Sequence, residues 1–94
     1  MQISYDPFKR AQTLELRGID MADAGEVFLG PCITIADDRF DYGEPRFITV
    51  GFLCGRMVLL AWTPRKDTLR IISMRKANAR ENARFGSQLR SHSW

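Results

Sequence analysis

The first third of the chain has polar and apolar residues at helical spacing. Asp6 followed by Pro7 is typical of a helix start, because aspartate caps free amide groups and proline fits the first helical position. Apolar residues recur up to Gly18, which supplies a stop. Asp20 marks the start of a second short helix that ends near residue 30. The pattern predicts two N-terminal helices lying on one face of a sheet.

From residue 32 the pattern changes to short apolar runs separated by turn-rich segments. The runs read CITIA, RFITVGFL, RMVLLAW and TLRIISM. Four such runs with short connections predict an antiparallel meander, and residues 2–5 are long enough only for a terminal strand or an extended lead-in. Ile48 and Val50 face one way while Phe47 and Leu53 face the other. One face should therefore meet the helices, and the other face either the C-terminal helix or another chain.

A capping-box pattern marks the last predicted helix. Asn78 and Glu81 are three residues apart, with asparagine in place of the usual serine or threonine. We expect the helix to end near Phe85 and residues 86–94 to form a loose tail. The sequence therefore predicts one α+β domain over residues 1–94, with two N-terminal helices, an antiparallel sheet of about four strands and a C-terminal helix.

The composition is that of an ordinary soluble globular domain, with 45% hydrophobic and 27% charged residues. No apolar run reaches the roughly 18 residues that a membrane span needs. The first ten residues also lack the basic and then apolar layout of a secretory signal. We therefore expect a cytoplasmic protein that does not bind membranes.

Charge is distributed unevenly along the chain. Residues 1–63 contain six basic and nine acidic residues, a net charge of −3, whereas residues 64–94 contain eight basic and two acidic residues, a net charge of +6. A basic pole on a small domain favours binding to nucleic acid, or to an acidic protein that covers the same surface. An ordinary solvated basic face is the alternative.

The sequence offers little support for metal or cofactor chemistry, and we expect neither. His92 is the only histidine, and Cys32 and Cys54 lack the spacing of a zinc site. Because both cysteines lie in apolar runs, buried free thiols are expected. The acidic segment 37–45 does not match the spacing of a calcium loop, so we interpret it as a solvated loop.

The remaining candidates are basic residues around one carboxylate. They are Lys9, Arg65, Arg75, Lys76, Arg80, Glu81 and Arg84. Cleaving RNA without a metal or histidine requires a base for the ribose 2′-hydroxyl, cations for the phosphate and a proton for the departing 5′-oxygen. Arginine meets the second need. Glu81 could act as the base and Lys9 as base or acid, although the capping box alone also accounts for Glu81.

Several short motifs, in this order and spacing, resemble the BrnT family of small bacterial toxins, the partners of BrnA-type antitoxins. The matching pieces are Tyr5-Asp6-Pro7 with Lys9, Gly18-Ile19, residues 24–28, the run RFITVG at 46–51, and the run RIISMRKA at 70–77 with Arg80-Glu81. The chain departs from the family at Leu16-Arg17, where Lys-His is common, at Thr13, where Asn is common, and at Phe85, where Tyr is frequent.

The resemblance implies a RelE-like fold and a metal-independent endoribonuclease that inhibits translation. It also implies a hetero-oligomer with a BrnA-type antitoxin, through which alone the protein would meet promoter DNA. Five residues fall on positions that look like the family's functional ones. On this reading Arg65, Arg75 and Arg80 hold the RNA phosphate, and Glu81 and Lys9 handle protons.

Two other readings stay open. A non-catalytic module, a degenerate toxin, could grip nucleic acid or an acidic antitoxin through the same cations. Arg75→Ala separates this reading from an enzyme, because a binder loses only part of its affinity. An autonomous DNA-binding regulator is less well supported, because no helix-turn-helix pair ending in a recognition helix is predicted.

Overall fold

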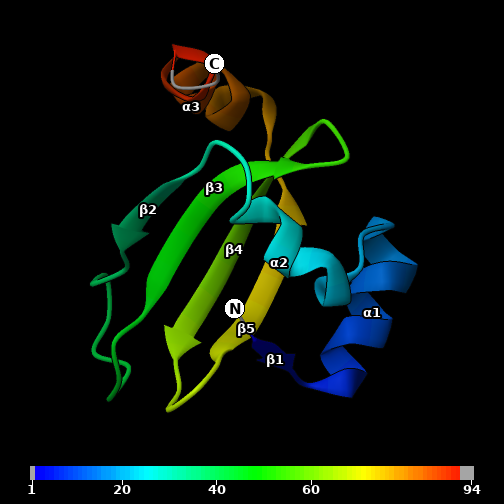
Figure 1. Cartoon of the computed structure of the whole chain (residues 1–94), viewed down its shortest axis with the longest axis vertical. Coiled ribbons are helices and arrows are strands. Elements are labelled where there is room, and N and C mark those ends of the chain that lie inside the picture. Colours follow the sequence, from blue (N-terminus) through cyan, green and yellow to red (C-terminus); the bar gives the residue numbers. More distant parts are fainter. Residues whose placement is uncertain (1, 92–94) are drawn as a thin grey trace.

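The computed structural model describes residues 2–91 and contains one five-stranded sheet with the strand order β1-β5-β4-β3-β2. The strands are β1 (Ile3–Tyr5), β2 (Ile33–Ala36), β3 (Phe47–Leu53), β4 (Arg56–Pro64) and β5 (Leu69–Lys76). The helices are α1 (Pro7–Arg17), the 3₁₀ turn η1 (Met21–Asp23), α2 (Ala24–Val27) and α3 (Ala79–Ser91). Figure 1 shows α1 and α2 on one side of the sheet and α3 at its upper end. The α+β class is thus confirmed.

The N-terminal helices start where the sequence predicts. The Asp6 side chain accepts a hydrogen bond from the Phe8 amide at 2.9 Å, and Gly18 ends α1 in the left-handed conformation, at a φ of 69°. Asp20 likewise caps the next segment through the Ala22 amide. That second segment is shorter than expected, however, because it divides into the 3₁₀ turn η1 and the single-turn helix α2.

The four predicted strands pair as an antiparallel meander, β2 with β3, β3 with β4 and β4 with β5. Cys54 and Gly55 form the two-residue turn between β3 and β4, both at positive φ, as tight hairpins require. The prediction is incomplete at the N-terminus. Residues 3–5 add β1 as a fifth strand, parallel to β5, so the sheet is mixed rather than antiparallel.

Both faces of the sheet carry a hydrophobic core. On the first face, η1 and α2 cover buried residues of β3, β4 and β5, among them Leu60, Ile71 and Met74. Gly51 makes this contact possible, because a Cβ atom there would lie only 2.6 Å from Cγ1 of Val27. On the second face, α3 covers a smaller cluster of buried residues. That cluster contains Val50, Met57, Leu59, Phe85 and Leu89.

Helix α3 extends further than predicted. The expectation of a loose tail from residue 86 is wrong for residues 86–91, which continue the helix. Leu89 lies one turn after Phe85, so both side chains are buried against the second face of the sheet. His92 lies outside the described residues. No helix within residues 2–91 is long and apolar enough to span a membrane.

The two cysteines are free, but only one is shielded. Cys32 is partly buried, whereas Cys54 is exposed at the tip of the β3–β4 hairpin. The expectation of two buried thiols is therefore wrong for Cys54. A two-residue turn projects beyond the sheet, so its side chains have nothing to pack against.

Candidate functional site

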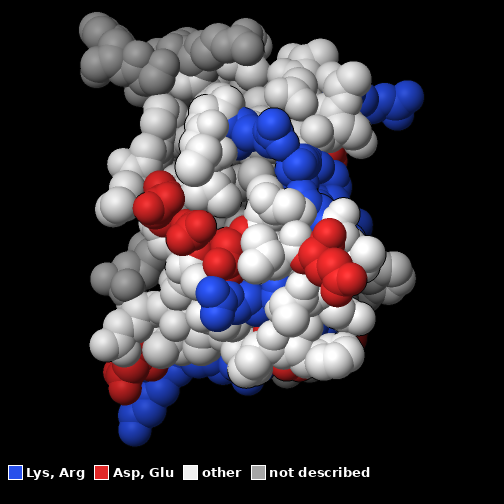
Figure 2. All heavy atoms as spheres, turned by 90° about the vertical axis from the view of Figure 1, so that its right-hand side faces the viewer, with Lys and Arg blue, Asp and Glu red and all other residues white. Residues whose placement is uncertain are grey.

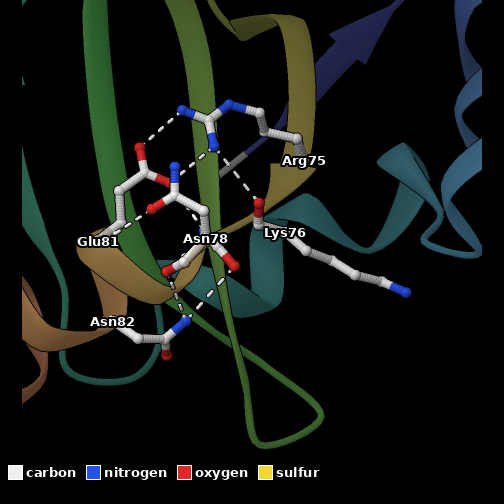
Figure 3. A network of polar contacts seen from close by, with 6 residues as sticks. Arg75, Lys76, Asn78, Glu81 and Asn82 are labelled. Atoms are coloured by element: carbon white, nitrogen blue, oxygen red, sulfur yellow. Dashed lines mark hydrogen bonds and ion pairs between the residues drawn. The ribbon is translucent and has the colours of Figure 1, made fainter.

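The end of β5 and the start of α3 are joined by an ion pair between Arg75 and Glu81 (Figure 3). Arg75 donates from Nη1 and Nη2 to the two carboxylate oxygens of Glu81 at 2.8 and 2.7 Å. Glu81 Oε1 also accepts from the Asn78 amide at 2.9 Å, while Asn78 Oδ1 accepts from the Glu81 amide at 2.8 Å. The capping box predicted from the sequence is therefore formed, and Arg75 is attached to it.

These contacts strongly favour the ionised form of Glu81. The hydrogen bonds from Arg75 come first among the causes that lower the pKa of Glu81 to about 2, and the Asn78 amide adds to them. A carboxylate with so low a pKa, and with both oxygens occupied, has little tendency to take a proton from a ribose hydroxyl. The geometry therefore favours Glu81 as the residue that orients Arg75 and begins α3, rather than as a general base.

Two cations of α1 lie along the free edge of β5. Strand β1 pairs with β5 only as far as Ile71. Beyond that point Lys9 Nζ lies 3.5 Å from the carbonyl oxygen of Ile72, and Arg17 Nη1 donates to the carbonyl oxygen of Met74 at 2.9 Å. The structure thus brings Arg17 to the same strand that carries Arg75.

The other two predicted residues are placed differently. Arg80 is exposed on the first turn of α3, next to Glu81, and forms no ion pair with any residue that the structure describes. Arg65 lies in the turn between β4 and β5, where it pairs with Glu44 at 3.2 Å. Since Arg65 precedes β5 and Arg75 stands near its end, the two are separated by about 20 Å of strand. The structure does not bring Arg65 to the Arg75–Glu81 pair.

An open cleft on the second face of the sheet reveals a cation that the sequence did not single out. The cleft has a volume of about 160 Å³ and is lined by Arg39, Ile48, Leu59, Leu60, Ala61, Ser73 and Arg75. Arg39 comes from the connection between β2 and β3. The only local signal is its position two residues after Asp37, and the path of a ten-residue connection cannot be predicted from such a pair.

The acidic segment is mostly exposed, as expected of a solvated loop, but three of its four carboxylates have partners. The Asp37 side chain is 1% exposed and holds Arg39 at 2.8 Å, while Asp41 accepts from the Gly43 amide and Glu44 pairs with Arg65. Asp37, Asp41 and Glu44 thus bind arginines or a backbone amide, whereas Asp38 is exposed. Within residues 2–91 no three His, Cys, Asp or Glu side chains lie close enough together to hold a metal ion.

The side of the molecule that carries α1 bears charges of both signs. Figure 2 shows Lys and Arg side chains crossing its upper half, Asp and Glu side chains at mid-height, and further Lys and Arg side chains below these. Arg17 and Lys76 both lie at the end of β5. The Nζ atom of Lys76 is 3.9 Å from a Cβ built on Gly18, the residue that follows Arg17.

Comparison with protein-family models identifies the family of the chain. Residues 5–81 match the family described as ribonuclease toxin, BrnT, of type II toxin-antitoxin system. A search of curated proteins found no match. The matched range contains all five residues predicted from the sequence, and Arg39 as well. Since it covers most of the 94 residues, the chain belongs to the BrnT family of ribonuclease toxins of type II toxin-antitoxin systems.

Proposed function

We propose that this chain is an endoribonuclease toxin that cleaves RNA without a metal ion and thereby inhibits translation. The observation that carries the proposal is Arg75. It stands at the exit of β5, is held by Glu81, and remains 44% exposed beside an open cleft. An arginine fixed in this way can meet a phosphate without first losing side-chain freedom. We further infer a RelE-like arrangement and action in the cytoplasm.

In this proposal the basic residues have different roles. Arg75 and Arg80 stabilise the negative charge that grows on the phosphate in the transition state. Lys9, on the neighbouring edge of β5, is the candidate proton carrier, and Glu81 keeps Arg75 in place. Arg65, at the far end of β5, would contact a more distant phosphate of the same RNA.

A second candidate function is a non-catalytic module that binds nucleic acid or antitoxin through the same cations. One observation favours it. The Glu81 carboxylate is already bonded to Arg75 and to the Asn78 amide, so the site has no ready general base at this position. Substitution of Arg75 distinguishes the two functions: an enzyme should lose RNA cleavage, whereas a binding module should lose only part of its affinity.

The decisive experiment measures RNA cleavage by purified protein in the presence of EDTA, together with growth arrest on induced expression. Arg75→Ala should lower kcat/KM by about 10²-fold or more, because an interaction with the reacting phosphate is lost. Arg56→Ala is the matched control, since Arg56 is exposed in the β3–β4 hairpin, away from the cleft. Equal cleavage by both variants would contradict the site, and cleavage abolished by EDTA would contradict metal independence.

We also propose that a BrnA-type antitoxin neutralises the chain in a hetero-oligomer and alone brings it to promoter DNA. Helix α1 supports a protein partner, because it has no buried residue and leaves Phe8 70% and Leu16 78% exposed. Co-expression of the adjacent small gene should relieve growth arrest and raise the melting temperature of the purified toxin. A neighbour that binds without either effect would count against this partnership.

A further inference from the structure

The open cleft on the second face of the sheet has an arginine from each of two distant segments. Arg75 reaches it from β5 and Arg39 from the β2–β3 connection. Helix α3 covers only the part of this face around Val50, Met57 and Leu59, so the cleft stays accessible. The cleft is also lined by apolar residues of β3 and β4 and by Ser73.

Arg39 is held over the cleft by a buried carboxylate. Asp37 accepts from Nε and Nη2 of Arg39 at 2.8 and 3.0 Å, and the Tyr42 hydroxyl donates to Asp37 Oδ2 at 3.3 Å. The Asp37 amide in turn donates to the carbonyl oxygen of Arg46 at 2.8 Å, which ties this point to the start of β3. Arg39 itself remains 67% exposed. A surface arginine that served solubility alone would need no buried aspartate to orient it.

Both arginines keep donors for a further acceptor. A guanidinium has five N–H groups. The pair with Asp37 uses Nε and Nη2 of Arg39 and leaves Nη1, while the pair with Glu81 uses Nη1 and Nη2 of Arg75 and leaves Nε. Each side chain can therefore bind an anion while its carboxylate pair stays intact.

The two positive charges also act on one another. The hydrogen bonds that Arg75 donates to Glu81 raise the pKa of Arg75, whereas the positive charge of Arg39 acts in the opposite direction. Both arginines line the same cleft, where like charges repel one another. An anion bound between them would relieve that repulsion.

We propose that Arg39 is an RNA-binding residue, and that Arg39 and Arg75 hold the phosphates on either side of one nucleotide of single-stranded RNA. The nucleotide would lie over Ile48 and Ala61, which offer apolar surface, with the Ser73 hydroxyl as a polar contact. A cleft of about 160 Å³ admits part of one strand. This inference rests on the proposed function, because it takes RNA as the substrate.

The test measures binding of a short single-stranded 2′-O-methyl RNA, which cannot be cleaved through its 2′-hydroxyl, by fluorescence anisotropy at several salt concentrations. Arg39→Ala should weaken binding about tenfold and reduce the slope of log K against log salt by about 0.7, the value for one phosphate contact on a single strand. Arg39→Lys should recover part of the affinity, because it restores the charge but not the fork. In cleavage assays Arg39→Ala should raise KM more than it lowers kcat.

Two variants serve as controls. Arg56→Ala should keep the affinity and salt slope of the wild type. Arg39→Ala leaves the buried Asp37 carboxylate unpaired and could unfold the loop for that reason alone. The double variant Asp37→Asn with Arg39→Gln removes both charges and avoids this problem. It should bind RNA as weakly as Arg39→Ala.

The outcomes separate this inference from the proposed function. If the wild type binds and cleaves RNA, and the Arg39 variants match it in affinity and salt slope, the role of Arg39 is overturned while the toxin stands. Equal affinity for a duplex of the same sequence would overturn the single-strand assignment. A wild type that neither binds nor cleaves RNA overturns both proposals.

Discussion

Arg17, the last residue of α1, donates from Nη1 to the carbonyl oxygen of Met74 at 2.9 Å. The contact falls on the part of β5 that β1 leaves unpaired. A side chain of α1 thus takes the place of a neighbouring strand there. This matters for the helix as much as for the sheet, because α1 has no buried residue of its own.

Arg17→Ala should loosen the attachment of α1. A hydrogen bond from a charged donor contributes about 1.5–3 kcal/mol at most, and partial exposure should bring the loss to about 1 kcal/mol. The expected result is faster amide hydrogen exchange in residues 10–17 and a melting temperature about 4–8 °C lower. Gln12→Ala, at an exposed position of the same helix, is the control. Unchanged exchange in α1 would show that the Met74 contact does not hold the helix.

Glu81→Gln should affect stability more than catalysis. Glutamine can still complete the capping box with Asn78, so the variant removes chiefly the ion pair with Arg75. We expect a loss of about 0.5–1 kcal/mol and an RNA cleavage rate within about tenfold of the wild type. Glu15→Gln, exposed on α1, is the matched control. A fall in rate of 10²–10⁴-fold at unchanged RNA affinity, with loss of the ascending limb of the pH–rate profile, would instead identify Glu81 as the general base.

Leu89→Ala should destabilise the fold strongly. Leu89 is 1% exposed and packs in the cluster under α3, so truncation removes buried apolar contacts and leaves a cavity. We expect a loss of about 2–5 kcal/mol in urea unfolding. Ser87→Ala, exposed on the same helix, should change stability by less than about 0.5 kcal/mol. Equal effects of the two variants would mean that residues 86–91 do not pack on the sheet.

Stability should fall as the pH is lowered from about 4.5 towards 2. Hydrogen bonds from Arg10 and the Ala22 amide lower the pKa of Asp20 from 3.8 to about 2. Hydrogen bonds from Arg75 likewise lower the pKa of Glu81 from 4.5 to about 2. Because both pKa values are lower in the folded state, the unfolded chain binds more protons in this range, and acid favours unfolding. Between pH 5.5 and 7 the ionisation of these groups does not change.

The measurement is the urea midpoint as a function of pH. Asp20→Asn should flatten the acid limb, whereas Asp38→Asn, at an exposed position without an ion pair among the described residues, should leave it unchanged. An equally steep limb in Asp20→Asn would show that the pair with Arg10 contributes little to the acid sensitivity.

The features that could be read from the sequence depend on contacts between close neighbours. The cap at Asp6, the stop at Gly18 and the capping box of Asn78 and Glu81 each involve residues at most four apart. Their geometry follows from backbone sterics and a single hydrogen bond, so residue type is a sufficient guide. The alternation of apolar residues likewise indicated four strands and a sheet with two apolar faces.

What could not be read depends on segments that are distant along the chain. Whether residues 3–5 pair with β5, and whether α3 continues to Ser91, depends on which apolar surface is left uncovered after the meander forms. Glu81 shows the same limit. Its capping role involves only Asn78, three residues away, whereas its pairing with Arg75 depends on where β5 ends relative to α3.

The sequence by itself thus determined the α+β class, the helix starts, the antiparallel meander and the BrnT family, since these rest on local spacing and ordered motifs. Tertiary structure alone decided which cations share a site. It separated Arg65 from Arg75 by the length of β5. It also placed Arg39 at the cleft, where the buried Asp37 side chain holds it. The reason is physical. The sequence shows that Arg39 lies two residues after Asp37, but the direction in which this loop points depends on how it packs on the rest of the fold.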